Sequence, residues 1–144
     1  METEVVAEIL GGRKVLGKTI RKPHELAHLV RQGLPASSVT ALAEKLDVGR
    51  TALSRKLGIP QRTLTRRLSQ RSRLTAAESD RTVRFARVYA NAVEMIGDEE
   101  KAVEWLRTPN RALGGARPLD QLDTDPGARA VEDVLGRIAY GVYS

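Results

Sequence analysis

The chain has 144 residues, of which 41% are hydrophobic and only 3% aromatic, and this length suits one compact domain or two small helical subdomains. Because few aromatic side chains are available, burial must come mainly from Leu, Val, Ile and Ala, which predicts an all-α protein. The lack of cysteine excludes disulfides and thiolate chemistry, and no apolar run approaches the roughly 18 residues of a membrane-spanning helix, so we expect a cytoplasmic protein without a membrane partner.

The net charge of +6 is divided unevenly along the chain. Residues 1–75 contain 15 Lys and Arg against 6 Asp and Glu, whereas residues 76–144 contain 9 against 12. A basic half is typical of proteins that bind a phosphate backbone, and a mildly acidic half suits contacts with another protein. The two halves are therefore expected to face different partners.

Residues 1–22 show the weakest pattern, and we treat them as an N-terminal segment of uncertain structure. Residues 4–12 fit a short helix or a strand, and residues 12–23 look like a basic loop or an extended segment. Helix signals become regular from Pro23 onward. One helix is predicted from Pro23 to Gly33, and a second begins at Ser37 or Ser38, either of which can cap it.

Residues 50–70 have the pattern of a helix-turn-helix. Thr51 can cap a short helix, the residues Gly-Ile-Pro at 58–60 interrupt it, and Pro60 stands where a second helix begins. Residues 50–73 contain eight Lys or Arg and no acidic residue. At about 100° per residue, Leu64 and Leu68 share one face of the second helix, and polar side chains occupy the opposite face.

Such a polar helix is suited to the major groove of DNA. Arginines reach guanine or phosphates, and Gln, Thr and Ser contact bases or backbone. We therefore predict that residues 23–74 form a DNA-binding helix-turn-helix part. The candidate DNA-binding residues are Gln61, Arg62, Thr63, Thr65, Arg66, Arg67, Ser69, Gln70 and Arg71. The alternative is an ordinary solvated helix that is rich in arginine.

The acidic half begins with a long connecting helix over residues 75–97. Thr75 and Glu78 form a capping box at its start, and Gly97 ends it. Its predicted buried side consists of Val83, Ala86, Val88, Ala90, Val93 and Ile96. Residues 98–144 then contain a shorter helix before Pro109, an irregular stretch at 111–127, and a last helix from about Asp125 to Ala139.

The sequence lacks the residue sets that enzymes and metal sites use. His24 and His28 have the i, i+4 spacing of paired metal ligands, but no third ligand accompanies them. The residues Leu-Gly-Gly-Ala-Arg-Pro at 113–118 resemble a phosphate-binding loop only superficially, because no strand precedes them, and a tight turn is the simpler interpretation. We expect neither an enzymatic activity nor a cofactor or metal.

Two aromatic features of the acidic half each have two interpretations. Trp105 is either a core anchor or a contact in an interface. Tyr140, Val142 and Tyr143 follow the last helix, and they either fold back onto the helices or reach a partner.

With these pieces in order, the sequence resembles the Xre/MbcA/ParS-like antitoxins of RES–Xre toxin–antitoxin pairs. The N-terminal likeness lies in "LGIPQRTLTRRL" at 57–68 followed by "RLTAAESDRTVRFARV" at 73–88. The C-terminal likeness is stronger and lies in "AVEWLRTPNRALGGARPLDQLDTDPGARAVEDVLGRIAYGV" at 102–142. The resemblance covers residues 24–144.

This resemblance implies an antitoxin whose C-terminal domain, residues 98–144, binds a RES-domain toxin of the NAD-degrading or ADP-ribosylating class and covers its active site. It also implies a homodimer within a larger hetero-oligomer, and repression of its own operon through binding of operator DNA. The toxin-binding residues that it indicates are Trp105, Arg137, Tyr140, Gly141, Val142, Tyr143 and Ser144.

Two other functions fit the sequence. One is a stand-alone helix-turn-helix transcriptional regulator whose C-terminal half only dimerises. The other is an adaptor that binds nucleic acid without sequence preference, which predicts similar affinity for operator and random DNA at a fixed salt concentration.

Overall fold

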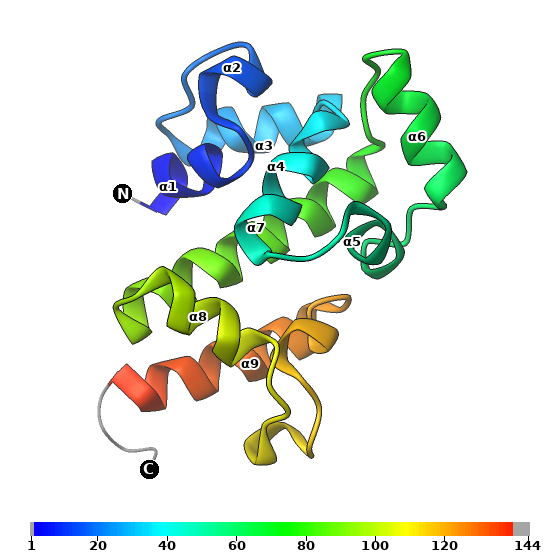
Figure 1. Cartoon of the computed structure of the whole chain (residues 1–144). Helices are drawn as coiled ribbons and strands as arrows, with labels where there is room; N and C mark the ends of the chain where they lie inside the picture. The colour runs from blue at the N-terminus through cyan, green and yellow to red at the C-terminus, as the bar shows by residue number, and fades with distance from the viewer. Residues whose placement is uncertain (1, 140–144) are drawn as a thin grey trace. The chain divides into compact units, whose positions relative to one another are not determined.

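The computed structural model describes residues 2–139, and its regular secondary structure there is helical (Figure 1). The only β-type pairing among these residues is an isolated bridge between Pro35 and Arg73. The predicted all-α fold is therefore confirmed. The chain divides into two compact units, Met1–Ala86 and Arg87–Ser144, and the division falls inside the longest helix. None of the helices in the described part of the chain is long and apolar enough to cross a membrane.

The first unit consists of short helices and the start of a long one. They are α1 Glu2–Ile9, α2 Gly12–Leu16, α3 Pro23–Gln32, α4 Ser37–Leu46, α5 Arg50–Lys56, α6 Gln61–Ser69 and the first part of α7 Ala76–Ile96. Leucines from every part of the unit form its core, together with Ile59 and Phe85. The helices predicted after Pro23 are confirmed, including the end of α3 at Gly33.

The N-terminal segment is more regular than the sequence indicates. The expected loop or extended segment at 12–23 is wrong in its first part, because residues 12–16 form α2. Gly11 and Gly12 both adopt positive φ, which lets the chain reverse between α1 and α2. Leu16 and Ile20 are buried and hold the segment against the unit. A helix of five residues is too short to produce a periodic pattern.

Two predicted helix caps are also wrong. The N-cap of α4 is Ala36 rather than Ser37 or Ser38. The N-cap of α5 is Gly49 rather than Thr51, and no side chain caps this helix. At the start of α4 a backbone turn supplies an acceptor, because the Ser38 amide donates to the Pro35 carbonyl at 3.0 Å. At the start of α5 the Leu53 amide donates to the Gly49 carbonyl at 3.0 Å, which is the ordinary first hydrogen bond of a helix.

Helix α7 begins with the predicted capping box, and its C-cap is Gly97, at φ 86°. Its buried side differs from the predicted aliphatic stripe. Ala86 and Val88 are buried as expected, whereas Val83, Ala90, Val93 and Ile96 are only half-buried. The buried positions are Glu78, Ser79, Thr82, Phe85, Ala86, Val88, Tyr89 and Ala92. The buried side of α7 starts with polar residues, and a prediction based on aliphatic spacing does not include them.

The second unit contains the rest of α7, then α8 Glu99–Leu106, the 3₁₀ turns η1 Arg111–Leu113 and η2 Pro118–Gln121, and α9 Asp125–Ala139. Arg87 and Asn91 of α7 both contact the Glu132 carboxylate of α9, at 3.1 Å and 2.9 Å. Gly127 permits α9 to start close to η2, because a Cβ there would lie 1.9 Å from the Gln121 carbonyl oxygen. Ala128, Val131, Val134 and Leu135 are the buried residues of α9, and Ile138 is half-buried.

Candidate DNA-binding and partner-binding surfaces

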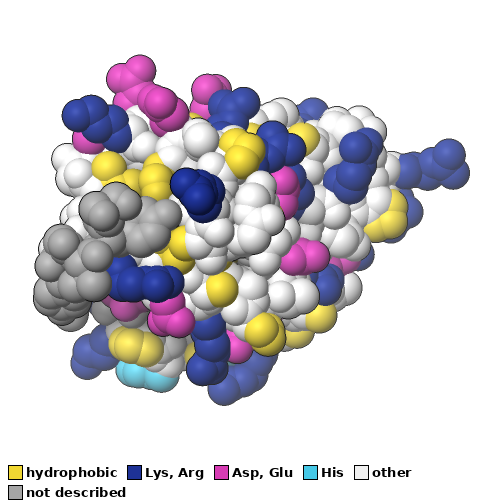
Figure 2. All heavy atoms as spheres, turned by 90° about the horizontal axis from the view of Figure 1, so that it is seen from below, with side chains coloured by type: hydrophobic (Ala, Val, Ile, Leu, Met, Phe, Trp, Pro, Cys, Tyr) yellow, Lys and Arg dark blue, Asp and Glu magenta, His cyan; other side chains and the backbone are white. Residues whose placement is uncertain are grey.

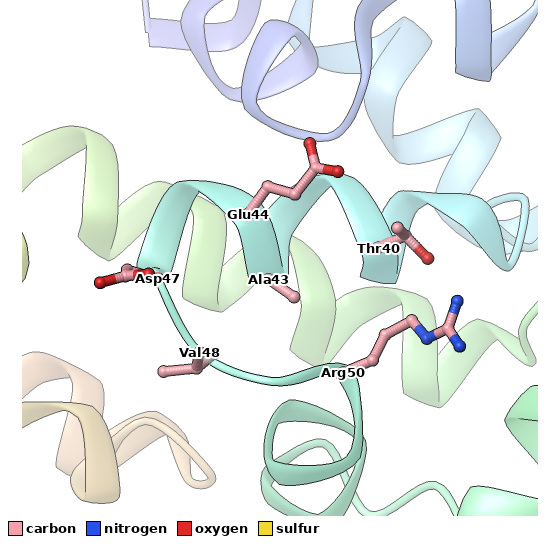
Figure 3. A pocket seen from close by; sticks show the side chains of 6 residues that line it. All are labelled: Thr40, Ala43, Glu44, Asp47, Val48 and Arg50. Carbon is pink, nitrogen blue, oxygen red and sulfur yellow. The ribbon is translucent and has the colours of Figure 1, made fainter.

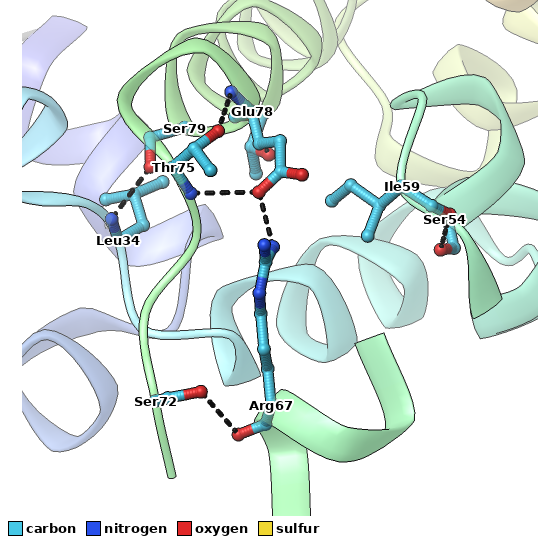
Figure 4. A network of polar contacts seen from close by, with 9 residues as sticks. Leu34, Ser54, Ile59, Arg67, Ser72, Thr75, Glu78 and Ser79 are labelled. Carbon is cyan, nitrogen blue, oxygen red and sulfur yellow. Dashed lines mark hydrogen bonds and ion pairs between the residues drawn. The ribbon is translucent and has the colours of Figure 1, made fainter. Parts of the chain in front are cut away.

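The turn between α5 and α6 is closed by two reciprocal hydrogen bonds. The Ser54 hydroxyl donates to the Ile59 carbonyl oxygen at 2.5 Å, and the Ile59 amide donates to the Ser54 carbonyl oxygen at 2.9 Å (Figure 4). Gly58 has φ 73°, and Pro60 immediately precedes α6. Ser54 and Ile59 are both buried. The two helices therefore form a fixed helix-turn-helix, as the sequence predicts.

Helix α6 is tied to α7 by an ion pair between Arg67 and Glu78, drawn in Figure 4. The Glu78 carboxylate also accepts the Thr75 amide at 2.8 Å, and the Thr75 hydroxyl accepts the Glu78 amide at 3.1 Å. Burial raises the pKa of the Glu78 carboxyl, but the Thr75 amide and the Arg67 guanidinium outweigh burial, so this pKa lies below its ordinary value of 4.5. Glu78 is therefore a charged anchor for α6 at neutral pH.

The segment that leaves α6 is fixed as well. The Ser72 amide donates to the Arg67 carbonyl oxygen at 2.9 Å, and the Leu74 amide donates to the Leu34 carbonyl oxygen at 2.8 Å. The Leu34 amide in turn donates to the Ser79 hydroxyl at 2.8 Å. A Cβ on Gly33 would lie 2.1 Å from the Leu74 carbonyl oxygen, so this close crossing of two backbones requires glycine. Both ends of α6 are thus held by the unit.

The outward face of α6 carries most of the predicted DNA-binding residues. Gln61, Arg62, Thr65, Arg66 and Ser69 line one open hollow of about 660 Å³, and all five are exposed. Gln70 and Arg71 are exposed just beyond the helix. Leu64 is buried beneath this face. The structure thus brings seven of the nine predicted residues onto or next to one solvated, acid-free surface.

The remaining two predicted DNA-binding residues lie differently. Thr63 is half-buried, and the Arg67 guanidinium points to Glu78 rather than outward. The predicted helix alone does not reveal this difference, because Glu78 is eleven residues away on another helix. The local sequence therefore could not separate Arg67 from Arg62 and Arg66.

A second hollow, of about 440 Å³, lies along α4 and the start of α5 and was not indicated by the sequence (Figure 3). It is lined by Thr40, Ala43, Glu44, Asp47, Val48 and Arg50. Two carboxylates make it a poor site for phosphates, because like charges repel. The hollow on α6, which lacks acids, is the better candidate for DNA.

In the second unit, the described toxin-binding candidates are Trp105 and Arg137. Trp105 is half-buried on α8, next to the fully buried Leu106, and Arg137 is exposed in the last turn of α9. This intermediate burial is compatible with both interpretations of Trp105, and its role stays a prediction. Tyr140, Gly141, Val142, Tyr143 and Ser144 lie outside the described residues.

The loop after α8 is closed on itself. The Asn110 side chain accepts the Ala112 amide at 2.9 Å, and the Asn110 carbonyl oxygen accepts the Gly115 amide at 2.9 Å. The amides of Gly114 and Ala116 donate to other carbonyl oxygens of the same loop. This confirms the tight turn, because these amides are already used and do not point at a ligand.

On the face shown in Figure 2, basic side chains lie among acidic and hydrophobic ones.

Comparison with known proteins matches both units. Residues 25–87 match the model of the antitoxin Xre-like helix-turn-helix domain, and residues 91–141 match that of the antitoxin Xre/MbcA/ParS C-terminal toxin-binding domain. Antitoxin Xre of Photorhabdus laumondii is 38% identical over 123 residues, covering 85% of this chain and 82% of that protein. Antitoxin Xre of Yersinia enterocolitica is 44% identical over 73 residues, covering 50% and 49%. The Prs ADP-ribosylating antitoxin of Sphingobium is 24% identical over 131 residues, covering 85% and 82%.

Proposed function

We propose that this chain, which belongs to the Xre family of antitoxins, neutralises a RES-domain toxin by covering its active site and represses its own operon through α6. A toxin-binding domain and a helix-turn-helix domain are present in the chain, so a toxin partner follows from the family itself. The RES identity of that toxin, the operator DNA and a homodimer within a larger hetero-oligomer are parts of the proposal.

The observation that carries the proposal is the pairing of two different surfaces in one chain. The first unit presents an exposed, acid-free face on α6, and the second unit matches a toxin-binding domain. A protein that only needed to be soluble would mix charges of both signs on α6. This combination favours an antitoxin that also regulates transcription over a protein with either activity alone.

For repression, α6 enters the major groove. Arg62 and Arg66 reach guanine edges or phosphates, and Gln61, Thr65 and Ser69 contact bases or backbone from the same hollow. Because Arg67 and Ser72 hold the helix in place before DNA arrives, little ordering entropy is lost on binding. Two copies in a homodimer read two half-sites, which gives an operator with two-fold symmetry.

For neutralisation, the second unit binds the toxin through Trp105, Arg137 and residues 140–144. The half-buried indole supplies contact area without exposing the core, and Arg137 supplies a charged contact at the end of α9. The Sphingobium relative is named a Prs ADP-ribosylating antitoxin, and this name supports a toxin of the NAD-consuming class. Bound antitoxin removes active toxin by mass action, and no cofactor is needed.

Co-expression tests this function. The proposal requires a RES-domain reading frame next to this gene. That reading frame is induced in a bacterial host, with and without this chain, and growth and cellular NAD are followed. We expect the chain to restore both. If the neighbouring protein stays toxic while this chain is soluble and equally abundant, the antitoxin proposal is wrong and the stand-alone regulator becomes the better explanation.

A further inference from the structure

Residues 13–22 contain a second basic surface, separate from α6. Its five basic residues are Arg13, Lys14, Lys18, Arg21 and Lys22, all exposed, and no acidic residue interrupts them. We call this group the N-terminal basic surface. It precedes the part of the chain that matches the helix-turn-helix model, which begins at residue 25.

The N-terminal basic surface is held by the fold. Leu16 and Ile20 lie between the charged residues in the sequence, and they are only 6% and 3% exposed. Gly17 ends α2 in the left-handed conformation, with its amide donating to the Arg13 carbonyl oxygen at 2.9 Å. Runs of like charge usually form solvated tails, whereas here two buried anchors fix where the charges lie.

None of the five cations forms an ion pair within 4.0 Å among the residues that the structure describes, although the charge of Lys22 interacts with that of Glu25. Two acids border this surface: the Glu8 carboxylate lies against the backbone of Gly12, and Glu25 uses one carboxylate oxygen to accept the amides of Arg21 and Lys22, at 3.1 Å and 2.9 Å. Five positive charges within ten residues outnumber these two acids, and holding like charges close together costs free energy through repulsion. An external polyanion relieves this repulsion.

We propose that the N-terminal basic surface binds DNA phosphates that flank the bases read by α6. Both surfaces belong to the same compact unit, so their positions relative to one another are fixed by its core. In the view of Figure 1, α3 and α4 lie between α2 and α6, so the segment that carries the N-terminal basic surface is separate from α6. This inference rests on the DNA-binding part of the proposed function and adds a sequence-independent contact to it.

Phosphate contacts have a measurable signature that base contacts lack. Each phosphate that a protein neutralises steepens the dependence of log K on log salt by about 0.9 for duplex DNA. Contacts outside the recognised bases also strengthen operator and non-operator binding equally, so they leave the preference for operator unchanged. Removing three cations of the N-terminal basic surface should therefore reduce the slope by about 2 to 3 and leave specificity intact.

The test uses the full-length chain and DNA from upstream of its own reading frame. The triple variant Lys14→Gln, Lys18→Gln, Arg21→Gln is compared with a control of equal net charge in the second unit, Lys101→Gln, Arg111→Gln, Arg129→Gln. All six side chains are exposed. Binding is measured by fluorescence anisotropy over a series of salt concentrations. Two duplexes are used, one trimmed to the protected operator and one extended on both sides.

We expect the triple variant, but not the control, to show a reduced salt slope and weaker binding on the extended duplex, with an unchanged ratio of operator to random affinity. On the trimmed duplex the two variants should differ less. If wild type binds operator and both variants have its slope on the extended duplex, the inference is wrong while the proposed function stands. If wild type does not bind operator at all, the repression proposal and this inference both fail. A triple variant that binds DNA normally but no longer binds the toxin would assign the surface to toxin binding and overturn the inference.

Discussion

The guanidinium of Arg67 on α6 lies against the carboxylate of Glu78 on α7, and both side chains are largely buried, with exposed fractions of 17% and 12%. This contact joins the candidate recognition helix to the helix that follows it. Glu78 belongs at the same time to the capping box of α7 through Thr75. One carboxylate therefore fixes both the start of α7 and the position of α6.

The Glu78→Gln variant should lower the free energy of unfolding of the first unit by about 1 to 3 kcal/mol, because it leaves a largely buried guanidinium without its charged partner. Chemical denaturation followed by circular dichroism measures this change. Asp125→Asn is the matched control, because the Arg129–Asp125 pair is well exposed, at 76% and 52%. The control should cost less than about 1 kcal/mol. Equal effects of the two variants would show that the Arg67–Glu78 pair does not anchor α6.

The same pair predicts a pH dependence. The folded state lowers the pKa of Glu78, so the stabilisation is complete above the ordinary value of 4.5 and is lost as pH falls through the folded-state pKa. The stability difference between wild type and Glu78→Gln should therefore shrink as the pH falls below about 4.5. Denaturation curves of both proteins across this range check it. Glu25, whose pKa is also lowered, is present in both and cancels in the difference.

Charge reversal on the exposed face of α6 should separate the two proposed activities. Arg62→Glu combined with Arg66→Glu should abolish operator binding, because two phosphate or guanine contacts become repulsive, and should leave toxin neutralisation intact. Gel retardation and the co-expression assay measure the two activities in parallel. Undiminished operator retardation by the double variant would remove α6 from the DNA interface.

Two glycines of α9 should respond to alanine in opposite directions. Gly127→Ala should destabilise the second unit by about 2 kcal/mol or more, since its Cβ would meet the Gln121 carbonyl oxygen. Gly136→Ala, whose Cβ would meet nothing within 4 Å, should stabilise α9 by about 0.5 to 1 kcal/mol. Thermal unfolding compares the two variants. A neutral Gly127→Ala would mean that α9 does not start against η2 as described.

Features that one local signal determines could be predicted from the sequence. The sequence predicts the Thr75–Glu78 capping box, the glycine ends of α3 and α7, and the interruption at Gly58 before α6, and the structure has all of them. Each depends on a few adjacent residues whose chemistry admits one conformation. The all-α fold follows from the sum of such signals.

Features that depend on distant neighbours could not be predicted. Ser38 is buried inside α4 rather than capping it, because the backbone turn at Pro35 and Ala36 supplies the acceptors. The buried stripe of α7 includes Ser79 and Thr82, whose hydroxyls form hydrogen bonds within the unit. Arg67 lies against Glu78, and the spacing of residues within a helix cannot predict this pair, because the two residues belong to different helices. The candidate toxin-binding residues 140–144 stay predictions, because they lie outside the described residues.

The central claim is that this chain blocks a RES-domain toxin, and the most direct test is a titration of NAD consumption. Purified toxin from the neighbouring reading frame is mixed with NAD and increasing amounts of the full chain, with the chain truncated after Ala139 as a second titrant. We predict that NAD consumption falls to the background rate once the full chain saturates the toxin, and that the truncated chain is a weaker inhibitor. NAD consumption that continues undiminished in the presence of excess full chain would contradict the account.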